Sequence, residues 1–438
     1  MLSHSTTRRP ALIVLSLLSL YLVQAVALAQ MSGQDRSRAR KMLKQLRQDV
    51  EKHYYDPTYG GVDLEAAYQD ALHEIEAVNS LPEAFDAIAR FMDGLGDSHT
   101  FFVPPLSSSE VDYGFEASFV GDTCFITEVK EGGPAAKVGI RVGDAVPRMG
   151  PFNLRRENLT QVEYQLHVLY PQQTLGVVIR SPDGAQRPVV VVSEFDKIPF
   201  HTIDPSNPMI LRWLKDRAHD LAEENAHVTV EVGEHVIVWK MTAFDWRPIA
   251  DKVIDKARKR RALVLDLRGN TGGGVDVLQR VIGRLFEETV TIGRIVTRKG
   301  EKEEVAKPRG GKPFLGELIV LVDSRSGSAS EILARVVQLR GRGVVMGDRT
   351  AGAVMTSRLE LHKVGFKRYW QYGASIAISD VIMEDGGRLE GVGVVPDAIV
   401  LPTSLDLREG RDPVMVRALA RVGVEIDPIL AARIYEKD

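Results

Sequence analysis

The spacing of apolar residues changes along the chain, and each change marks a different kind of structure. Between residues 36 and 93, apolar side chains recur every three to four positions, which is the period of a helix packed on a core. Asp56-Pro57 interrupts this pattern, and Leu81-Pro82-Glu83 opens a new helix after it. The pattern predicts a small N-terminal helical domain over residues 34–105.

From residue 111, short runs rich in β-branched residues are separated by glycines. Residues 124–129 alternate apolar and polar positions, as a half-buried strand does. We therefore expect a small β domain over residues 111–193, either an ordinary β-barrel or a specialised module. The run GGPAAKVGIRVGDAV, which starts at Gly132, resembles the signature of PDZ domains. The resemblance implies a peptide-binding loop before the first strand, at Tyr113, Gly114, Phe115 and Glu116, whose amides would hold a peptide carboxylate.

From about residue 194, apolar runs of strand length alternate with helical patterns. The expected buried strands are residues 235–239, 262–267, 318–322 and 343–346, and the expected helices between them are residues 249–259 and 330–338. Alternating strands and helices predict an α/β unit with a largely parallel sheet, and functional loops usually lie at the strand ends of such a sheet. We assign this core to residues 194–402, followed by a C-terminal helical segment at 403–438.

The N-terminus has the pattern of a targeting segment. Arg8 and Arg9 precede an apolar run from Ala11 to Ala29, which ends in Ala27-Leu28-Ala29. Small residues at those positions are typical of signal-peptide cleavage, so residues 1–29 are expected to be a signal peptide and the mature protein to be periplasmic or secreted. The alternative is an uncleaved membrane anchor, the one case in which membrane association is expected.

Composition narrows the function classes. The 438 residues carry 56 Lys and Arg against 59 Asp and Glu, a net charge of −3, which lacks the basic excess of a nucleic-acid binder. A single cysteine, Cys124, excludes an intramolecular disulfide framework and a cysteine-rich zinc site. No H-x-x-x-H pair occurs among the ten histidines, so neither a metal nor an organic cofactor is expected.

Three loops have sequences suited to chemistry. Residues 266–274 (DLRGNTGGG) end a strand in glycines that expose backbone amides, and residues 323–332 (DSRSGSASEI) connect a buried strand to a helix through small residues. A serine at such a turn can be held exposed beside amides that stabilise an oxyanion, or it can simply cap the helix. The third loop, residues 94–102 (GLGDSHTFF), contains a histidine flanked by hydroxyl groups.

The ordered set of signal segment, helical domain, PDZ-like insert, D-L-R-x-N-x-G-G and S-x-S-A-S-E resembles the C-terminal processing (tail-specific) serine proteases over nearly the whole mature chain. This resemblance implies a ClpP/crotonase-like mixed α/β protease core. It also implies that Ser328 is the nucleophile and that the amides of Ala329 and of Gly272 or Gly273 form the oxyanion hole.

One position departs from the family pattern. Members with a Ser-Lys dyad carry the lysine in a T-x-G-K segment, but Ala353 stands at that position here, and Lys363 and Lys367 lie farther on. The segment Gly96 to Thr100 (GDSHT) instead resembles a branch that includes the tricorn core protease and interphotoreceptor retinoid-binding protein.

In that branch the histidine is the general base, the serine before it assists, and a late glutamate completes the set. The matching residues here are His99, Ser98 and Glu390, with Glu384 as the other candidate glutamate. A serine hydroxyl needs a base near neutral pH, and histidine serves without the large pKa shift that a lysine would need.

These observations predict an exported serine endopeptidase that acts on proteins or peptides, recognised through their C-termini by the PDZ-like domain. Two alternatives stay open. In the first, the chain is a catalytically inactive protease fold that binds ligands or partner proteins. In the second, it is an esterase that uses the same residues.

Overall fold

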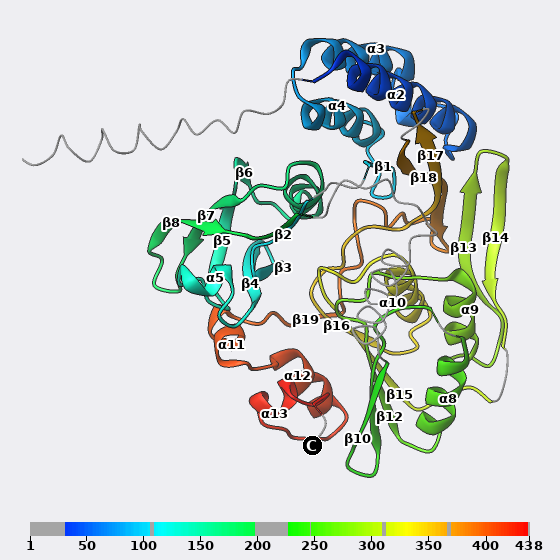
Figure 1. Ribbon diagram of the computed structural model, residues 1–438. Coiled ribbons are helices and arrows are strands. Elements are labelled where there is room, and N and C mark those ends of the chain that lie inside the picture. Colours follow the sequence, from blue (N-terminus) through cyan, green and yellow to red (C-terminus); the bar gives the residue numbers. More distant parts are fainter. Residues whose placement is uncertain are drawn as a thin grey trace, which may run out of the picture.

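The computed structural model describes residues 31–105, 109–197, 227–245, 247–308, 312–365 and 369–436 (Figure 1). Within these ranges the chain is a mixed α/β protein with two large sheets in the region that carries the chemistry, a β domain inserted before them, and helices at both ends. The expected signal peptide at residues 1–29 lies outside the described residues.

The central sheet has six strands. All pairs are parallel except the first, which is antiparallel. In spatial order the strands are β10 (Val228–Val232), β11 (Val236–Lys240), β12 (Ala262–Asp266), β15 (Glu317–Val322), β16 (Val344–Gly347) and β19 (Ala398–Ile399). The four apolar runs that the sequence assigned to strands form β11, β12, β15 and β16, so the expectation of a largely parallel sheet is confirmed.

Both faces of this sheet are covered, which explains why its strands are continuously apolar. Along β12, Leu263 and Leu265 face one core cluster while Ala262 and Val264 face another. The first cluster is closed by α8 (Arg247–Ala257), α9 (Val275–Gly283) and α10 (Ala329–Leu339). The second is closed by α12 (Pro413–Arg421) and α13 (Pro428–Ala432), which follow α11 (Ser404–Glu409).

A second, antiparallel sheet was not anticipated from the sequence. It contains β1 (Phe101–Val103), β13 (Val290–Thr297), β14 (Gly300–Ala306), β17 (Met355–Val364) and β18 (Trp370–Met383). The long strand β18 pairs with β17 along one edge and with β1 and β13 along the other. This arrangement brings the segment after the N-terminal helices beside residues about 270 positions later.

The N-terminal helices pack on that second sheet. They are α2 (Gly33–His53), α3 (Leu64–Ala77) and α4 (Leu81–Asp93), with a short 3-10 turn, η1 (Tyr59–Gly61), between the first two. Ser32, Asp63 and Ser80 cap their N-termini with side-chain oxygens. Their apolar faces share one hydrophobic core with β17 and β18.

The inserted β domain is antiparallel. Its strands are β3 (Phe115–Val120), β4 (Thr123–Val129), β5 (Ala145–Met149), β6 (Phe152–Asn153), β7 (Thr174–Arg180) and β8 (Gln186–Val192). Its helical turns are α5 (Pro134–Lys137), α6 (Leu159–Tyr164) and η2 (Gln165–Leu169). Because β2 (Ser109–Asp112) pairs with β9 (Glu194–Lys197), the chain enters and leaves this domain through one two-stranded ribbon.

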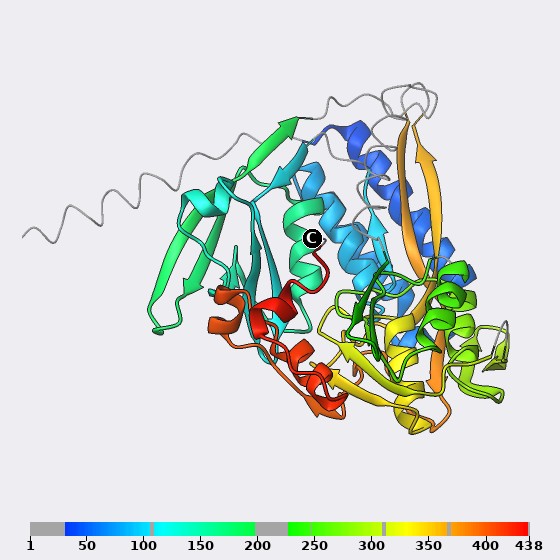
Figure 2. The ribbon, with the colours of Figure 1, turned by 90° about the horizontal axis from the view of Figure 1, so that it is seen from below.

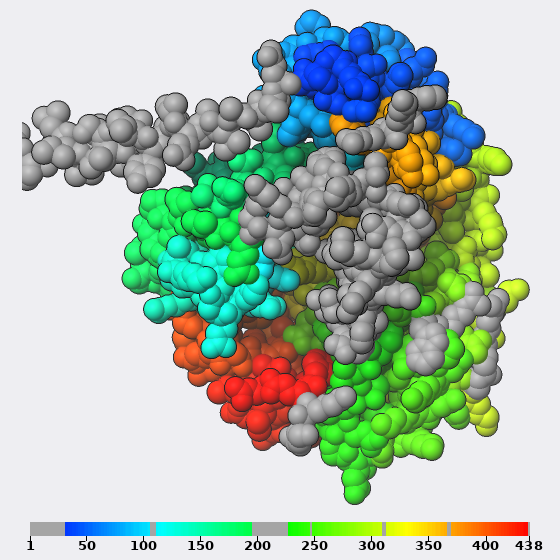
Figure 3. Space-filling model, in the orientation of Figure 1, coloured from blue at the N-terminus to red at the C-terminus, as the bar shows by residue number. Residues whose placement is uncertain are grey.

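The β domain lies to one side of the central sheet, and the C-terminal helices lie between the two (Figure 2). Asp348, after β16, accepts hydrogen bonds from the Gly121 amide and from Arg156 of the β domain. On the other side, Ser404 and Arg408 bond to Gly143 and Asp144. In the space-filling view the N-terminal helices occupy one end of the molecule and the C-terminal helices the opposite end (Figure 3). No helix in the described ranges has both the length and the apolar character needed to cross a bilayer.

Candidate active site

Ser328 lies at a strained turn between β15 and α10. Its backbone has φ 53° and ψ −117°, in the region that non-glycine residues rarely adopt, and such strain costs about 1–3 kcal/mol. The loop before it is fixed from inside, because the buried Ser326 donates its hydroxyl to the Leu267 carbonyl at 2.8 Å and accepts from the Asp323 amide at 2.9 Å. This geometry resembles the strand-to-helix turn that exposes a nucleophilic serine.

A buried glutamate fixes the segment around Ser328. Glu331 is completely buried, and its carboxylate accepts hydrogen bonds from the amides of Ser328, Gly352 and Ala353 and from the Thr350 hydroxyl, at 2.6–3.0 Å. Burial raises the pKa of Glu331, and these four hydrogen bonds oppose that shift. The sequence analysis gave Glu331 no role, although it belongs to the S-A-S-E motif; its position in the first turn of α10 was the available signal.

The glycine loop lies directly against Ser328. A Cβ added to Gly272 would come within 2.5 Å of the Ser328 Cβ, and one added to Gly273 would meet the Phe244 carbonyl oxygen at the same distance. Both glycines have positive φ, 109° and 140°. These positions therefore require glycine for close approach as well as for backbone conformation.

The two candidate oxyanion amides of this loop differ in availability. The Gly272 amide donates to the side-chain oxygen of the buried Asn270 at 2.8 Å. The amides of Gly273 and Ala329 donate to no acceptor within the described part of the chain. The free pair is therefore Gly273 and Ala329, and Gly272 serves to shape the loop. Asn270 was not singled out from the sequence although it is part of the D-L-R-x-N motif.

His99 is the start of a hydrogen-bonded chain that ends in a carboxylate. Its Nδ1 lies 2.7 Å from Ser98 Oγ, and Ser98 Oγ lies 3.0 Å from Glu390 Oε2. An ionised carboxylate only accepts, so the single hydroxyl proton of Ser98 points to Glu390 and the Ser98 oxygen accepts from His99 Nδ1–H. In the neutral imidazole this arrangement corresponds to the tautomer protonated at Nδ1, which leaves Nε2 as the acceptor.

Further bonds fix both ends of this chain. Glu390 also accepts from the amides of Ser98 at 2.7 Å and Val354 at 2.6 Å. Asp97 accepts from the His99 amide at 2.8 Å and from the Tyr54 hydroxyl at 3.0 Å. Burial lowers the pKa of the His99 imidazole below its usual value, and the charges of Glu390 and Asp97 partly offset that effect. Asp97 and Tyr54 are positioning residues that the sequence analysis missed.

Of the two candidate glutamates, the structure brings only Glu390 to Ser98. Glu384 is exposed and forms an ion pair with Arg340 at 2.8 Å, on a different side of the loop.

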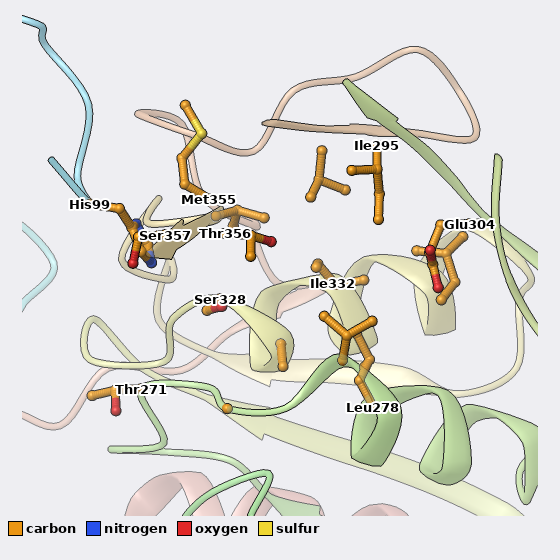
Figure 4. Close-up of a pocket in the computed structure, with 16 residues that line it drawn as sticks. His99, Thr271, Leu278, Ile295, Glu304, Ser328, Ile332, Met355, Thr356 and Ser357 are labelled. Carbon is orange, nitrogen blue, oxygen red and sulfur yellow. The ribbon is translucent and has the colours of Figure 1, made fainter. Parts of the chain in front are cut away.

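Ser328 and His99 line the same cavity of about 300 Å³ (Figure 4). No hydrogen bond joins their side chains. The two side chains lie on opposite walls at one end of the cavity. Its remaining lining comes from the glycine loop, α9, α10, β13, β14, the start of β17 and β18. The site is thus composed of segments from four distant parts of the sequence.

The structure also places Ala353 and Lys363, two of the three positions considered for a dyad lysine. Ala353 lies in backbone contact with Ser328, because its carbonyl accepts the Ser328 amide at 2.9 Å. No ammonium group is therefore present where the family's dyad lysine is expected. Lys363 lies near the far end of β17, with its ammonium 4.6 Å from the ring centre of Tyr369. Lys367 lies outside the described residues.

The segment expected to bind a peptide carboxylate is partly occupied by internal contacts. Tyr113 is buried and donates to the Gln172 carbonyl at 3.0 Å, and the Gly114 amide donates to Asp112 at 2.7 Å. Phe115 begins β3, and Glu116 forms an ion pair with Arg325 at 2.9 Å.

The loop before Ser328 also donates hydrogen bonds to the edge of β3 that faces away from β4. Arg325 donates to the Ala117 carbonyl at 2.8 Å, and Ser324 donates to the Phe119 carbonyl at 2.6 Å. A peptide that added to this edge would have to replace both bonds.

The described residues contain no candidate metal site, and the single cysteine is not a candidate nucleophile. Among the described residues, no group of three or more His, Cys, Asp or Glu side chains is arranged to hold a metal ion. Cys124 is buried, and burial raises the pKa of its thiol to about 12, so it is unsuited to act as a thiolate.

Known proteins resemble this chain over much of its length. Residues 236–400 match peptidase family S41. The chain is 23% identical over 331 residues to the carboxyl-terminal-processing peptidase 3 of Arabidopsis thaliana, covering 69% of this chain and 59% of that protein. It is 24% identical over 412 residues to a putative tricorn protease homolog 2 of Streptomyces coelicolor, covering 86% of this chain and 31% of that protein.

The fold also has solved counterparts. The structure of mature CPAF complexed with lactacystin covers 92% of this chain and all of its own, with a TM-score of 0.66 and 15% sequence identity. At this identity the likeness concerns the fold alone. The matched segment and the processing-peptidase relatives show that this chain is similar to the serine-type peptidases of family S41.

Proposed function

We propose that this protein is a serine endopeptidase in which Ser328 is the nucleophile and His99 the general base. The observation that carries the proposal is the hydrogen-bonded chain from Glu390 through Ser98 to His99 Nδ1, beside a cavity that His99 and Ser328 share. This chain supports a neutral histidine whose Nε2 accepts a proton, which is the state that a general base needs.

Each of these groups then has a role in the reaction. Ser328 Oγ attacks the scissile carbonyl carbon while its proton passes to His99 Nε2, and the amides of Gly273 and Ala329 stabilise the oxyanion that forms. The imidazolium gives its proton to the leaving amine, and the amine departs. Water then hydrolyses the acyl-enzyme by the same route. Glu390 acts through Ser98, where its negative charge stabilises the transient imidazolium.

The strain at Ser328 supports the same assignment. Strained non-glycine backbone is retained where surrounding contacts determine it, and such residues concentrate at functional sites. Here the four acceptor contacts of Glu331 hold the turn that aims Ser328 into the cavity. A serine that merely capped α10 would not need a backbone with φ of 53°.

We further propose that the mature protein is exported and that its β domain is a PDZ-like module that recruits unstructured protein C-termini. Support comes from the signal-like N-terminus and from the edge of β3 that faces away from β4, since β3 is the end strand of the β domain. The bonds that Ser324 and Arg325 make to that edge connect it to the nucleophile loop, so peptide addition and the conformation of Ser328 would influence each other.

The alternative of an inactive binding protein is favoured by Ala353, since the usual dyad lysine is absent. A direct experiment separates the two. An active-site serine probe and an unfolded protein substrate are offered to the wild type, to Ser328→Ala, and to Ser330→Ala as a neighbouring-serine control whose hydroxyl bonds to the Asn270 carbonyl. The peptidase proposal predicts labelling and cleavage that only Ser328→Ala abolishes; equal behaviour of wild type and Ser328→Ala would support the binding protein. Comparing matched peptide and ester substrates tests whether the enzyme is an esterase instead.

A further inference from the structure

The cavity beside Ser328 has apolar side chains between its two ends and a carboxylate at the end far from Ser328. Its apolar walls are Val275, Leu278, Ile292, Ile295, Ile332 and Val381. Figure 4 shows Glu304 at the opposite end from His99 and Ser328, with Ile295 and Ile332 in the space between. A side chain that entered beside the nucleophile would therefore pass apolar groups before it met a negative charge.

Glu304 is buried without a cationic partner. It is 7% exposed, on β14, where its neighbours Glu301, Lys302 and Glu303 are all exposed. The Gln279 amide nitrogen donates to Glu304 Oε1, and neither a donor to Oε2 nor an ion pair to this carboxylate is present in the described ranges. Burying an ionised carboxylate is costly unless an opposite charge or hydrogen-bond donors compensate.

The shape and charge of this cavity favour one class of occupant. Lysine and arginine carry a cationic head on a long apolar stem, and they commonly lay that stem along apolar surface while the head finds a polar partner. The apolar walls would contact the stem, and Glu304 Oε2 would accept a charge-assisted hydrogen bond from the head. A shorter apolar side chain would leave the carboxylate buried and unpaired, which opposes its binding.

Resting on the proposed function, we propose that this cavity is the primary specificity pocket and that Glu304 selects substrates with lysine or arginine immediately before the scissile bond. Glu304 is here a specificity-determining residue and takes no part in bond cleavage. Gln279 positions its carboxylate by occupying one oxygen and leaving the other toward the cavity.

The experiment compares two internally quenched peptides that differ only in the residue before the cleaved bond, lysine or norleucine. Norleucine has the same four-carbon stem without the charge. Both peptides are amidated at the C-terminus, so that a carboxylate-binding site elsewhere cannot contribute. They are assayed with the wild type, with Glu304→Gln, and with Glu303→Gln, which removes the same charge from the exposed neighbour on the same strand.

The wild type should cleave the lysine peptide with a kcat/KM at least about tenfold higher than the norleucine peptide, the value of one charge-assisted hydrogen bond. Glu304→Gln should lose that preference and should cleave the norleucine peptide at least as fast as the wild type does, which shows that the fold and Ser328 are intact. Glu303→Gln should behave as the wild type. Equal cleavage of the two peptides by the wild type, or an unchanged preference in Glu304→Gln, overturns the proposal.

Binding separates a failure of this inference from a failure of the proposed function. The same peptides are titrated into full-length Ser328→Ala and into Ser328→Ala with Glu304→Gln, by fluorescence anisotropy. A lysine preference that depends on Glu304 supports the pocket assignment even where the wild type cleaves neither peptide, a result that would refute only the peptidase proposal. Equal affinity for both peptides overturns the pocket assignment regardless of turnover.

Discussion

Replacing Glu390 by glutamine gives the most specific test of how the site works. The substitution keeps the shape of the side chain and an oxygen that can accept from the Val354 amide, but it removes the negative charge. The carboxylate is separated from the imidazole by two hydrogen bonds of 2.7 and 3.0 Å. At about 6 Å and an effective dielectric constant of about 20, an opposite charge stabilises the imidazolium by about 3 kcal/mol. Because the imidazolium forms in the transition state, kcat should fall by about 100-fold.

The acid limb of the pH profile should also shift in Glu390→Gln, in a direction that a merely structural defect would not reproduce. Burial already lowers the pKa of His99, and the charge of Glu390 opposes that effect. A general base works only when deprotonated, so the rate falls as the pH drops through this pKa. Without the Glu390 charge the pKa falls further, and the acid limb of kcat/KM should move to lower pH even as the plateau decreases.

The assay is peptide hydrolysis followed from acid to mildly alkaline pH, with Glu384→Gln as the matched control because Glu384 contacts Arg340 rather than Ser98. We expect Glu384→Gln to leave both plateau and acid limb unchanged. The reasoning is refuted if Glu390→Gln retains the full plateau, if its acid limb moves to higher pH, or if Glu384→Gln is the more damaging substitution.

Other substitutions test separate parts of the site. Ser328→Gly should raise the free energy of unfolding by about 1 kcal/mol relative to Ser328→Ala in urea denaturation, because glycine accepts the positive φ without strain; equal stabilities would contradict this. Gly272→Ala should abolish probe labelling, since its Cβ would collide with Ser328, whereas Gly300→Ala, also at positive φ but facing open space, should be labelled normally. In a peptidase assay Ala353→Lys should not raise turnover, because a second cation disfavours the imidazolium, and Lys363→Ala should leave it largely intact; a gain in the first or a complete loss in the second would indicate a lysine-dependent mechanism.

The parts of the fold that could be predicted are those whose burial is uniform. The strands of the central sheet are covered on both faces, so each appears as a continuous apolar run bounded by turns. The second sheet could not be recognised in this way. In its edge strand β17, only the first and last residues are buried, so no continuous apolar run marks the strand. Strand β1 has only three residues, and their partners, Gly373 to Ser375, lie far along the chain. Register between such distant segments is decided by tertiary packing.

The residues of the candidate site were also only partly predictable from the sequence. Motif and residue type indicated Ser328, His99 and Ser98. That Glu390 rather than Glu384 contacts Ser98 depends on the path of the loop after β18, which the sequence did not reveal. Choosing between Gly272 and Gly273 needed the bond from Gly272 to Asn270. Sequence reasoning also assumes a histidine with an ordinary pKa, whereas the burial of His99 lowers it. Each of these features depends on which groups a fold brings into contact.

The proposed mechanism requires that His99 remove the proton from Ser328. The most direct measurement is the rate at which a serine-directed peptidyl probe acylates Ser328, followed as a function of pH in the wild type and in His99→Ala. This mechanism predicts a wild-type acylation rate that is constant through neutral pH and falls only below the ordinary pKa of a histidine. It also predicts that His99→Ala reacts about 10²- to 10⁴-fold more slowly, with that acid limb gone. Unchanged acylation in His99→Ala, or a wild-type rate that rises only at alkaline pH, would contradict it.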